Sequence, residues 1–247
     1  MVNDTQVLNN GYPMPSIGLG VYKITDEDME NVVNTAIETG YRAFDTAYFY
    51  GNEVALGKAL QNSGVDREDL FITSKLWNDY QGYDNTIEYF NQSLENLGLD
   101  YIDLFLIHWP CEKDGLYIES YKALEKLYDE GKVKAIGVCN FKQHHLEKLM
   151  EETEVVPQVN QIELHPYFNQ EDVQEFCDNH DIKVTAWMPL MRNRGLLDDS
   201  TIVDIAKRYD KTPAQVVLRW HLAHNRLIIP KSKTPERIKE NFNILDF

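Results

Sequence analysis

Three apolar segments of the chain each end in a residue that can carry charge or exchange a proton. The segment YRAFD ends in Asp45, LFITSK ends in Lys75 and LFLIH ends in His108. A tyrosine, Tyr50, follows soon after Asp45, in the first residues of the next connection. If the three segments are neighbouring parallel strands, their carboxyl ends lie at one edge, and all four side chains converge there.

This set of residues can protonate an oxyanion. The ordinary pKa of a tyrosine phenol is about 10, which is high for a group that gives and regains a proton at neutral pH. The ammonium of Lys75 favours the phenolate and is expected to lower the pKa of Tyr50, while Asp45 keeps Lys75 charged and oriented. A neutral N–H of His108 can orient a carbonyl oxygen. The set predicts a general acid with an oxyanion clamp, and it contains no nucleophile.

Each of these residues also has a structural interpretation. A buried ion pair of Asp45 with Lys75 can simply stabilise a barrel, and a tyrosine near a strand end commonly only packs against its neighbours. His108 can be a hydrogen-bonded core histidine. The convergence of all four at one edge favours catalysis over these separate explanations.

A second cluster, IIPKSKTPERIKEN, surrounds a predicted helix start. Thr234 followed by Pro235 is typical of an N-cap residue and the first helical residue. Backbone amides and the helix dipole favour an anion at such an end. In a chain this acidic, basic residues gathered there predict a phosphate site, although a solvated basic face is the alternative. The residues concerned are Lys231, Ser232, Lys233 and Arg237.

Strand-like and helical segments alternate along the chain, as a (β/α)8 TIM barrel requires. A barrel of this kind typically needs about 250 residues, close to the 247 present. Eight apolar segments are expected to be parallel strands buried under helices. They are Ile17–Gly20, Tyr41–Asp45, Leu70–Lys75, Ile102–His108, Lys134–Val138, Gln158–Glu163, Lys183–Met188 and Leu227–Pro230.

Helical periodicity fills the stretches between these strands. The first helix is predicted between Thr25 and Gly40, with Thr25 and Asp28 resembling a capping box. One helix exceeds the eight-unit count, and we place it between strands seven and eight. Residues 6–11 predict an N-terminal β-hairpin with a tight turn. The other predicted helices cover about 53–63, 84–97, 119–130, 142–152, 170–180, 201–209, 213–224 and 235–242.

Composition excludes several classes of protein. With 24 Lys and Arg against 40 Asp and Glu, the net charge of −16 disfavours nucleic acid and anionic membranes as partners. No apolar stretch is long enough to span a membrane, and the start of the chain lacks the features of a secretory signal. Three scattered cysteines without a CxxC pair suggest a reduced, cytoplasmic protein.

Other motifs that would indicate a nucleotide or metal site are missing. The segment GLGVYK lacks the third glycine of a dinucleotide-binding fingerprint, and GNEVALGKA does not have the spacing of a P-loop. No HExxH motif occurs, and the adjacent histidines His144 and His145 do not have the spacing of two helical ligands. We therefore expect no metal.

The order of the motifs resembles that of the aldo-keto reductase family. These motifs are GYRAFDTAYFYGNE, SKLW, LIHWP, GVCNF, QVNQIELHPY and IPKSKTPERIKEN, and they cover essentially the whole chain. The resemblance is greatest to the bacterial branch that includes 2,5-diketo-gluconate reductases and glyoxal/methylglyoxal reductases. It implies one barrel domain over residues 1–247, usually monomeric, that reduces aldehydes or ketones with NADPH.

The resemblance also implies roles for particular residues. Asp45, Tyr50, Lys75 and His108 match the family's catalytic tetrad. Tyr50 would be the acid in reduction and the base in the reverse oxidation. In the family's steroid double-bond reductases a glutamate replaces the histidine, so His108 favours carbonyl reduction. The substrate pocket would add Tyr22, Trp77 and Trp109.

For the cofactor, NADPH/NADP⁺, the resemblance implies contacts at both ends. Asn140 and Gln161 would hold the nicotinamide carboxamide, and the ring would stack on Trp187. At the adenosine end, the 2′-phosphate would meet the basic cluster predicted above, which favours NADPH over NADH. The residues implied there are Lys231, Ser232 and Arg237, with Glu240 and Asn241 near the adenine.

The chain departs from the family pattern at several positions. Cys139 stands where a serine is usual, which would weaken one hydrogen bond to the carboxamide. Trp187 replaces the commoner tyrosine but keeps an aromatic face, and Met188 replaces a serine on the phosphate side. Family members usually continue for about 25 residues beyond the position of Phe247, into a segment that closes over the substrate. Either the protein lacks that segment or the segment lies outside this sequence; if the protein lacks it, we expect a pocket that is open on one side, with low or broad activity.

Two other functions compete with carbonyl reduction. The first is a nicotinamide-binding regulatory or sensor protein on the same fold, which would need an exposed apolar interface. The second is a barrel enzyme that uses the phosphate site for a sugar phosphate, such as an isomerase, with Glu163 as its base. The matched nicotinamide-site residues argue against the second.

Overall fold

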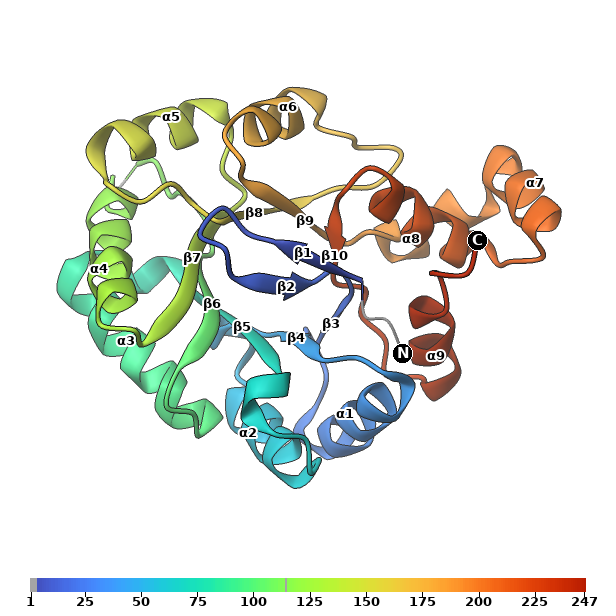
Figure 1. Cartoon of the computed structure of the whole chain (residues 1–247), viewed down its shortest axis with the longest axis horizontal. Coiled ribbons are helices and arrows are strands. Elements are labelled where there is room, and N and C mark those ends of the chain that lie inside the picture. The colour runs from blue at the N-terminus through green and yellow to red at the C-terminus, as the bar shows by residue number, and fades with distance from the viewer. Residues whose placement is uncertain (1–3, 114) are drawn as a thin grey trace.

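The chain forms a parallel eight-stranded barrel surrounded by helices (Figure 1). The structure, a computed structural model, describes residues 4–113 and 115–247. The sheet runs in chain order, so each strand lies beside the next one along the sequence. The strands are β3 (Gly18–Gly20), β4 (Ala43–Asp45), β5 (Phe71–Leu76), β6 (Ile102–Ile107), β7 (Val133–Cys139), β8 (Val159–Glu163), β9 (Lys183–Trp187) and β10 (Leu227–Ile228).

The predicted barrel is confirmed, and its two outermost strands meet. Ile17, just before β3, forms a parallel bridge with Ile228 of β10. The amide of Gly20 also donates to the carbonyl of Pro230 across 3.2 Å. Strands β5 and β6 are buried along their whole length. The sequence of β6 is accordingly apolar except for Asp103, whereas β5 buries the polar residues Thr73, Ser74 and Lys75 near the site.

Helices cover the outside of the barrel (Figure 1). The helix predicted as surplus is confirmed, because both α7 and α8 lie between β9 and β10. The helices of the described residues are α1 (Asp26–Thr39), α2 (Glu53–Asn62), α3 (Tyr83–Leu97), α4 (Tyr117–Asp129), α5 (Gln143–Glu152), α6 (Glu171–Asn179), α7 (Ser200–Tyr209), α8 (Pro213–Ala223) and α9 (Pro235–Phe242).

The capping box predicted for α1 forms only in part. The side chain of Thr25 accepts from the amide of Asp28 at 3.3 Å, as expected of an N-cap residue. The carboxylate of Asp28, however, pairs with Lys233 at 3.1 Å. This pair joins the start of α1 to the segment before α9, which the local sequence pattern could not show.

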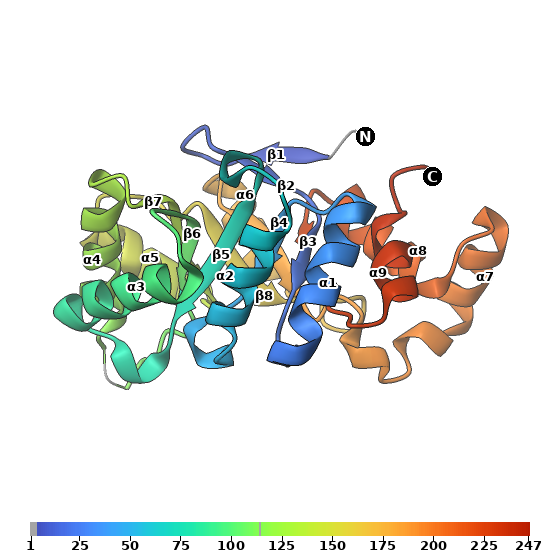
Figure 2. The same ribbon diagram turned by 90° about the horizontal axis from the view of Figure 1, so that it is seen from below.

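The predicted N-terminal hairpin is also present, as β1 (Thr5–Val7) and β2 (Pro13–Pro15). Figure 2 shows it lying across one end of the barrel. Leu8 and Met14 are buried there against barrel residues such as Phe71. The hairpin therefore closes the amino-terminal end of the barrel and leaves the carboxyl end of the strands for a site.

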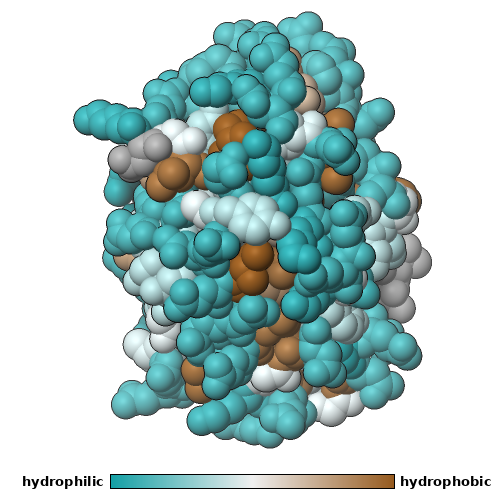
Figure 3. Space-filling model, turned by 90° about the vertical axis from the view of Figure 1, so that its left-hand side faces the viewer, coloured by the Kyte–Doolittle hydropathy of each residue, from teal (hydrophilic) through white to brown (hydrophobic). Residues whose placement is uncertain are grey.

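The surface is mainly hydrophilic on the side formed by α3, α4 and α5. Figure 3 shows hydrophobic residues there only in a narrow central strip and in scattered spots. Among the described residues, no helix has the length and apolar character needed to cross a membrane.

Candidate active site

The carboxyl ends of three neighbouring strands bring the predicted ionisable residues together. Asp45 is the last residue of β4, Lys75 lies near the end of β5, and His108 follows β6. Tyr50 ends a short 3-10 helix, η1 (Tyr48–Tyr50), directly after β4. Each therefore occupies the edge of the barrel that the sequence predicted.

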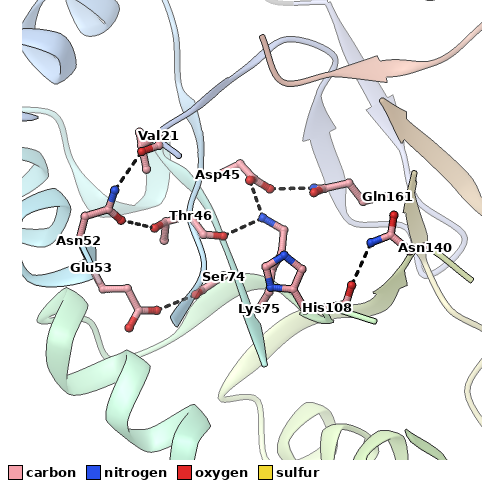
Figure 4. A network of polar contacts seen from close by, with 10 residues as sticks. All are labelled: Val21, Asp45, Thr46, Asn52, Glu53, Ser74, Lys75, His108, Asn140 and Gln161. Carbon is pink, nitrogen blue, oxygen red and sulfur yellow. Dashed lines mark hydrogen bonds and ion pairs between the residues drawn. The ribbon is translucent and has the colours of Figure 1, made fainter. Parts of the chain in front are cut away.

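Lys75 is completely buried and held by two acceptors (Figure 4). Its Nζ donates to Oδ1 of Asp45 at 2.5 Å and to the carbonyl of Thr46 at 2.8 Å. Gln161 donates to the other oxygen of Asp45 at 2.8 Å. Burial disfavours the ammonium, but Asp45 and Tyr50 outweigh it and raise the pKa of Lys75. The lysine is therefore a fixed cation.

Tyr50 lies between this cation and the imidazole. Lys75 Nζ is 5.2 Å from the centre of its ring, and the ring of His108 is 5.9 Å away in an edge-on arrangement. Burial raises the pKa of Tyr50 to about 12, although Lys75 acts to lower it. The predicted influence of Lys75 thus has the expected sign, but the expected net lowering was wrong because desolvation is larger.

His108 is neutral over the ordinary pH range. Burial, with the charge of Lys75, lowers its pKa to about 3. Its Nδ1 is buried without a hydrogen-bond partner in the described part of the chain. Nδ1 is therefore closed off from a ligand, and Nε2 is the ring nitrogen left to meet one. The carbonyl of His108 accepts from the side chain of Asn140 at 3.0 Å.

Aromatic side chains form the wall beside Tyr50. Tyr22 lies 4.8 Å from Tyr50 between ring centres, and Trp77 stands edge-on to His108 at 5.2 Å. Phe49 stacks on Trp77 at 3.8 Å with an interplanar angle of 17°. Phe49 was not predicted as a pocket residue. It immediately precedes Tyr50 in an aromatic run, which was the available signal.

Asn140 directly follows β7, Gln161 lies within β8 and Trp187 ends β9, and all three line the same cavity. The indole nitrogen of Trp187 donates to Oδ1 of Asn140 at 2.9 Å, and the amide of Asn140 donates to the carbonyl of Gln161 at 3.0 Å. The side-chain nitrogen of Gln161 donates to Asp45, which leaves the side-chain oxygen of Gln161 available as an acceptor. Cys139 lies beside them as a buried residue, and burial raises the pKa of its thiol, so it is uncharged.

The predicted phosphate site is at the start of α9. Thr234 is its N-cap residue and Pro235 its first residue, but Thr234 makes no side-chain capping bond. Instead the hydroxyl of Ser232 accepts from the amide of Thr234 at 3.1 Å. Lys233 points elsewhere, toward Asp28.

Two cations of this cluster remain available to bind an anion. Lys231 and Arg237 have no acidic partner among the ion pairs of residues 4–113 and 115–247. Burial, with Lys233 nearby, lowers the pKa of Lys231. Glu240 accepts from the hydroxyl of Thr212 at 2.5 Å, and Asn241 is buried.

One cavity of about 770 Å³ connects the groups around Tyr50 with those at the start of α9. Its volume falls within the range of small-molecule and cofactor sites. Every residue predicted for substrate or cofactor lines it, as do Asp45 and Tyr50, whereas Lys75 lies behind them. Met188 lines it too, together with two cations that sequence reasoning missed, Lys23 and Arg192.

Glu163, the alternative base, lies outside this cavity. It is not among the lining residues, and its carboxylate is 3.3 Å from Nε2 of His165. The geometry therefore offers no support for a sugar-phosphate isomerase built around Glu163.

A separate group of ionisable side chains joins the loop after β6 to α5. Oε1 of Glu112 contacts Nε2 of both His144 and His145, at 2.6 Å for His144. The positions of these three groups would suit a metal ion, a contact that the His144-His145 spacing did not reveal. Nδ1 of His145 accepts from the amide of Lys142 at 3.0 Å, however, so the proton of its neutral ring is on Nε2. That nitrogen is a donor to Glu112, which favours a hydrogen-bonded cluster over a metal site.

Comparison with known sequences gives a single family. The profile of the aldo/keto reductase family matches residues 16–247. The glyoxal reductase of Bacillus subtilis is 49% identical over 247 residues, which is 100% of this chain and 88% of the relative. The methylglyoxal reductase DkgA of Escherichia coli K12 is 47% identical over 249 aligned positions, or 100% of this chain and 90% of the relative.

Solved structures give the same result. An aldo/keto reductase from Brucella melitensis superimposes with a TM-score of 0.96 at 48% identity, covering 100% of this chain and 95% of the other. A point mutant of Gox0644 in complex with NADPH has a TM-score of 0.96 at 44% identity, covering 100% of this chain and 89% of the other.

Proposed function

Because the chain belongs to the aldo/keto reductase family and is an NADPH-dependent carbonyl-reducing oxidoreductase, we propose that the four residues around Tyr50 carry out its reaction. The observation that carries this proposal is the position of Tyr50 between a buried lysine ammonium and a neutral histidine, on the wall of the cavity. Tyr50 is the general acid in this mechanism.

The cavity suits the cofactor at both ends. The oxygen of Gln161 and the remaining hydrogen-bonding positions of Asn140 can hold a carboxamide, and Trp187 offers an aromatic face. Lys231 and Arg237, at the start of α9, can bind a phosphate. When bound, NADPH supplies the hydride for the carbonyl carbon.

The chain's own residues control the proton. Neutral His108 donates from Nε2 to the carbonyl oxygen and holds it near the phenol of Tyr50. As negative charge develops on that oxygen, Tyr50 transfers its proton to it. The ammonium of Lys75 then stabilises the phenolate, and Asp45 keeps that ammonium in place.

The substrate side favours small or flat carbonyl compounds. Its described walls are aromatic, formed by Tyr22, Phe49, Trp77 and Trp109. The names of the relatives point to dicarbonyls such as glyoxal and methylglyoxal as the first substrates to test.

The test is NADPH oxidation with methylglyoxal and a nitrobenzaldehyde, alongside NADPH binding followed by fluorescence. We expect binding and turnover together. Tight binding without turnover on any carbonyl of a panel would overturn the proposal and favour a sensor.

A further inference from the structure

Asn52 occupies the N-cap position of α2 but does not cap that helix. Asparagine is favoured at N-caps because its side-chain oxygen can accept from a free backbone amide of the first turn. In this chain the side chain of Asn52 makes no such bond. Its hydrogen-bonding groups are directed to other partners, all inside the protein.

These partners lie on two segments of the active site (Figure 4). Oδ1 of Asn52 accepts from the hydroxyl of Thr46 at 2.8 Å. Nδ2 donates to the carbonyl of Val21 at 2.9 Å and to that of Ile24 at 3.3 Å. Asn52 and Thr46 are both buried, so these bonds are not exchanged with water.

Thr46 matters because its carbonyl holds Lys75. An ammonium has three N–H groups. Asp45 takes one of them and the Thr46 carbonyl takes another, which leaves the third for Tyr50. The amide of Thr46 donates to Thr73 at 2.9 Å, and its hydroxyl is held by Asn52. These two bonds hold the residue whose carbonyl meets Lys75 by both its backbone and its side chain.

The second contact of Asn52 reaches the substrate wall. Val21 and Ile24 bracket Tyr22, whose ring is 4.8 Å from that of Tyr50. Asn52 is thus hydrogen-bonded to two segments of the site. One contains Thr46, whose carbonyl holds Lys75, and the other contains Tyr22, whose ring lies beside Tyr50.

We propose that Asn52 is a positioning residue for the reaction, which aligns Lys75 with Tyr50 through Thr46 and fixes Tyr22 to the same unit. This inference rests on the proposed function of Tyr50. It assigns Asn52 no contact with substrate or cofactor.

A neighbouring network provides a matched control. Ser74, adjacent to Lys75 on β5 and equally buried, donates to Glu53 at 2.6 Å. Asn96 donates to the other oxygen of Glu53 at 2.9 Å. Among the contacts of the described residues, this network does not include Thr46. We therefore expect Ser74→Ala to remove a buried hydrogen bond and to leave the alignment of Lys75 as it is.

The experiment compares Thr46→Val, Thr46→Ser, Asn52→Ala and Ser74→Ala in both reaction directions across pH. Thr46→Val has nearly the same shape but replaces the hydroxyl with a methyl group, so the bond to Asn52 is lost, while Thr46→Ser keeps the hydroxyl. The titratable groups that face Tyr50 are unchanged in all four variants; they are Tyr22, Asp45, Lys75, His108 and Cys139. Thermal midpoints are recorded for each variant.

We expect Thr46→Val and Asn52→Ala to lower kcat roughly 10-fold, a part of the ~10²–10⁴-fold that general acid–base catalysis provides. Because a misaligned Lys75 lowers the pKa of Tyr50 less, alcohol oxidation, which needs the phenolate, should begin at higher pH. The KM for NADPH should stay unchanged. Thr46→Ser and Ser74→Ala should keep the profile of the unmodified protein, even where Ser74→Ala lowers the thermal midpoint.

A Thr46→Val profile that matches the unmodified protein would overturn the inference, as would an equal shift in Ser74→Ala. If Asn52→Ala does not fold, the comparison of Thr46→Val with Thr46→Ser still tests the inference. Full activity of Tyr50→Phe in the same assay would instead refute the proposed function, and this inference with it.

Discussion

The indole nitrogen of Trp187 donates to Oδ1 of Asn140 across 2.9 Å. Nδ2 of the same Asn140 donates to the carbonyl of His108. The side chain proposed to hold the nicotinamide carboxamide is therefore held in one orientation from two sides. A tyrosine at position 187 would keep the aromatic face but could not donate from the indole position.

Trp187→Phe should weaken cofactor binding because it keeps an aromatic face and removes the N–H that orients Asn140. One hydrogen bond contributes about 0.5–1.5 kcal/mol, so the KM for NADPH should rise roughly 2–10-fold. Steady-state kinetics measure this. Trp220→Phe, outside the cavity, is the control, and an equal rise in both variants would contradict the role of the indole nitrogen.

Lys75→Met should impair alcohol oxidation more than carbonyl reduction. The pKa of Tyr50 is raised by burial and lowered by Lys75, so loss of the ammonium raises it further and depletes the phenolate that oxidation needs. The variant also leaves Asp45 buried without its cation, which costs about 3–5 kcal/mol of stability.

For that reason, Lys75→Met should be measured with Asp45→Asn in the same chain, so that no unpaired charge remains. Rates in both directions, at matched pH, give the comparison. Equal losses in the two directions would argue against a coupling of Lys75 to the phenol.

Carbonyl reduction should be nearly independent of pH between about pH 6 and pH 9. Tyr50 must be protonated to act, and burial raises its pKa to about 12, so it stays protonated throughout. Burial also lowers the pKa of His108 to about 3, so its ring stays neutral. A pH profile of kcat/KM checks both. An inflection near the ordinary histidine pKa, about 6.5, that disappears in His108→Asn would contradict this account.

Lys231→Ala and Arg237→Ala should weaken NADPH binding roughly 10–100-fold and leave NADH binding nearly unchanged. Each removes a cation proposed to meet the 2′-phosphate, and charge-assisted hydrogen bonds contribute about 1.5–3 kcal/mol. Lys233→Ala is a control of equal charge, because Lys233 pairs with Asp28 and does not line the cavity. The measurement is the dissociation constant of each variant for NADPH and for NADH. An equal loss of affinity for the two cofactors would contradict a 2′-phosphate site.

The sequence predicted the barrel and the edge where the site lies because both depend on local patterns. Apolar runs that end in Asp45, Lys75 and His108 place these residues by strand geometry alone. The start of α9 was equally predictable from Thr234 and Pro235.

Features that depend on three-dimensional contacts were not predictable. From the local sequence, Asn52 is a typical N-cap residue. Only the fold shows that its side chain is directed to Thr46 instead. The net pKa of Tyr50 depends on how far burial outweighs Lys75, which no spacing reveals. Arg192 reaches the cavity from an irregular segment with a left-handed backbone, where periodicity gives no guide.

The most direct test of the central claim is the Tyr50→Phe variant, assayed with methylglyoxal and NADPH. Phenylalanine keeps the ring and removes the hydroxyl, so NADPH should still bind as it does to the unmodified protein. Turnover should fall by about 10²–10⁴-fold, the contribution of a general acid. Unchanged turnover with intact NADPH binding would show that another group protonates the carbonyl.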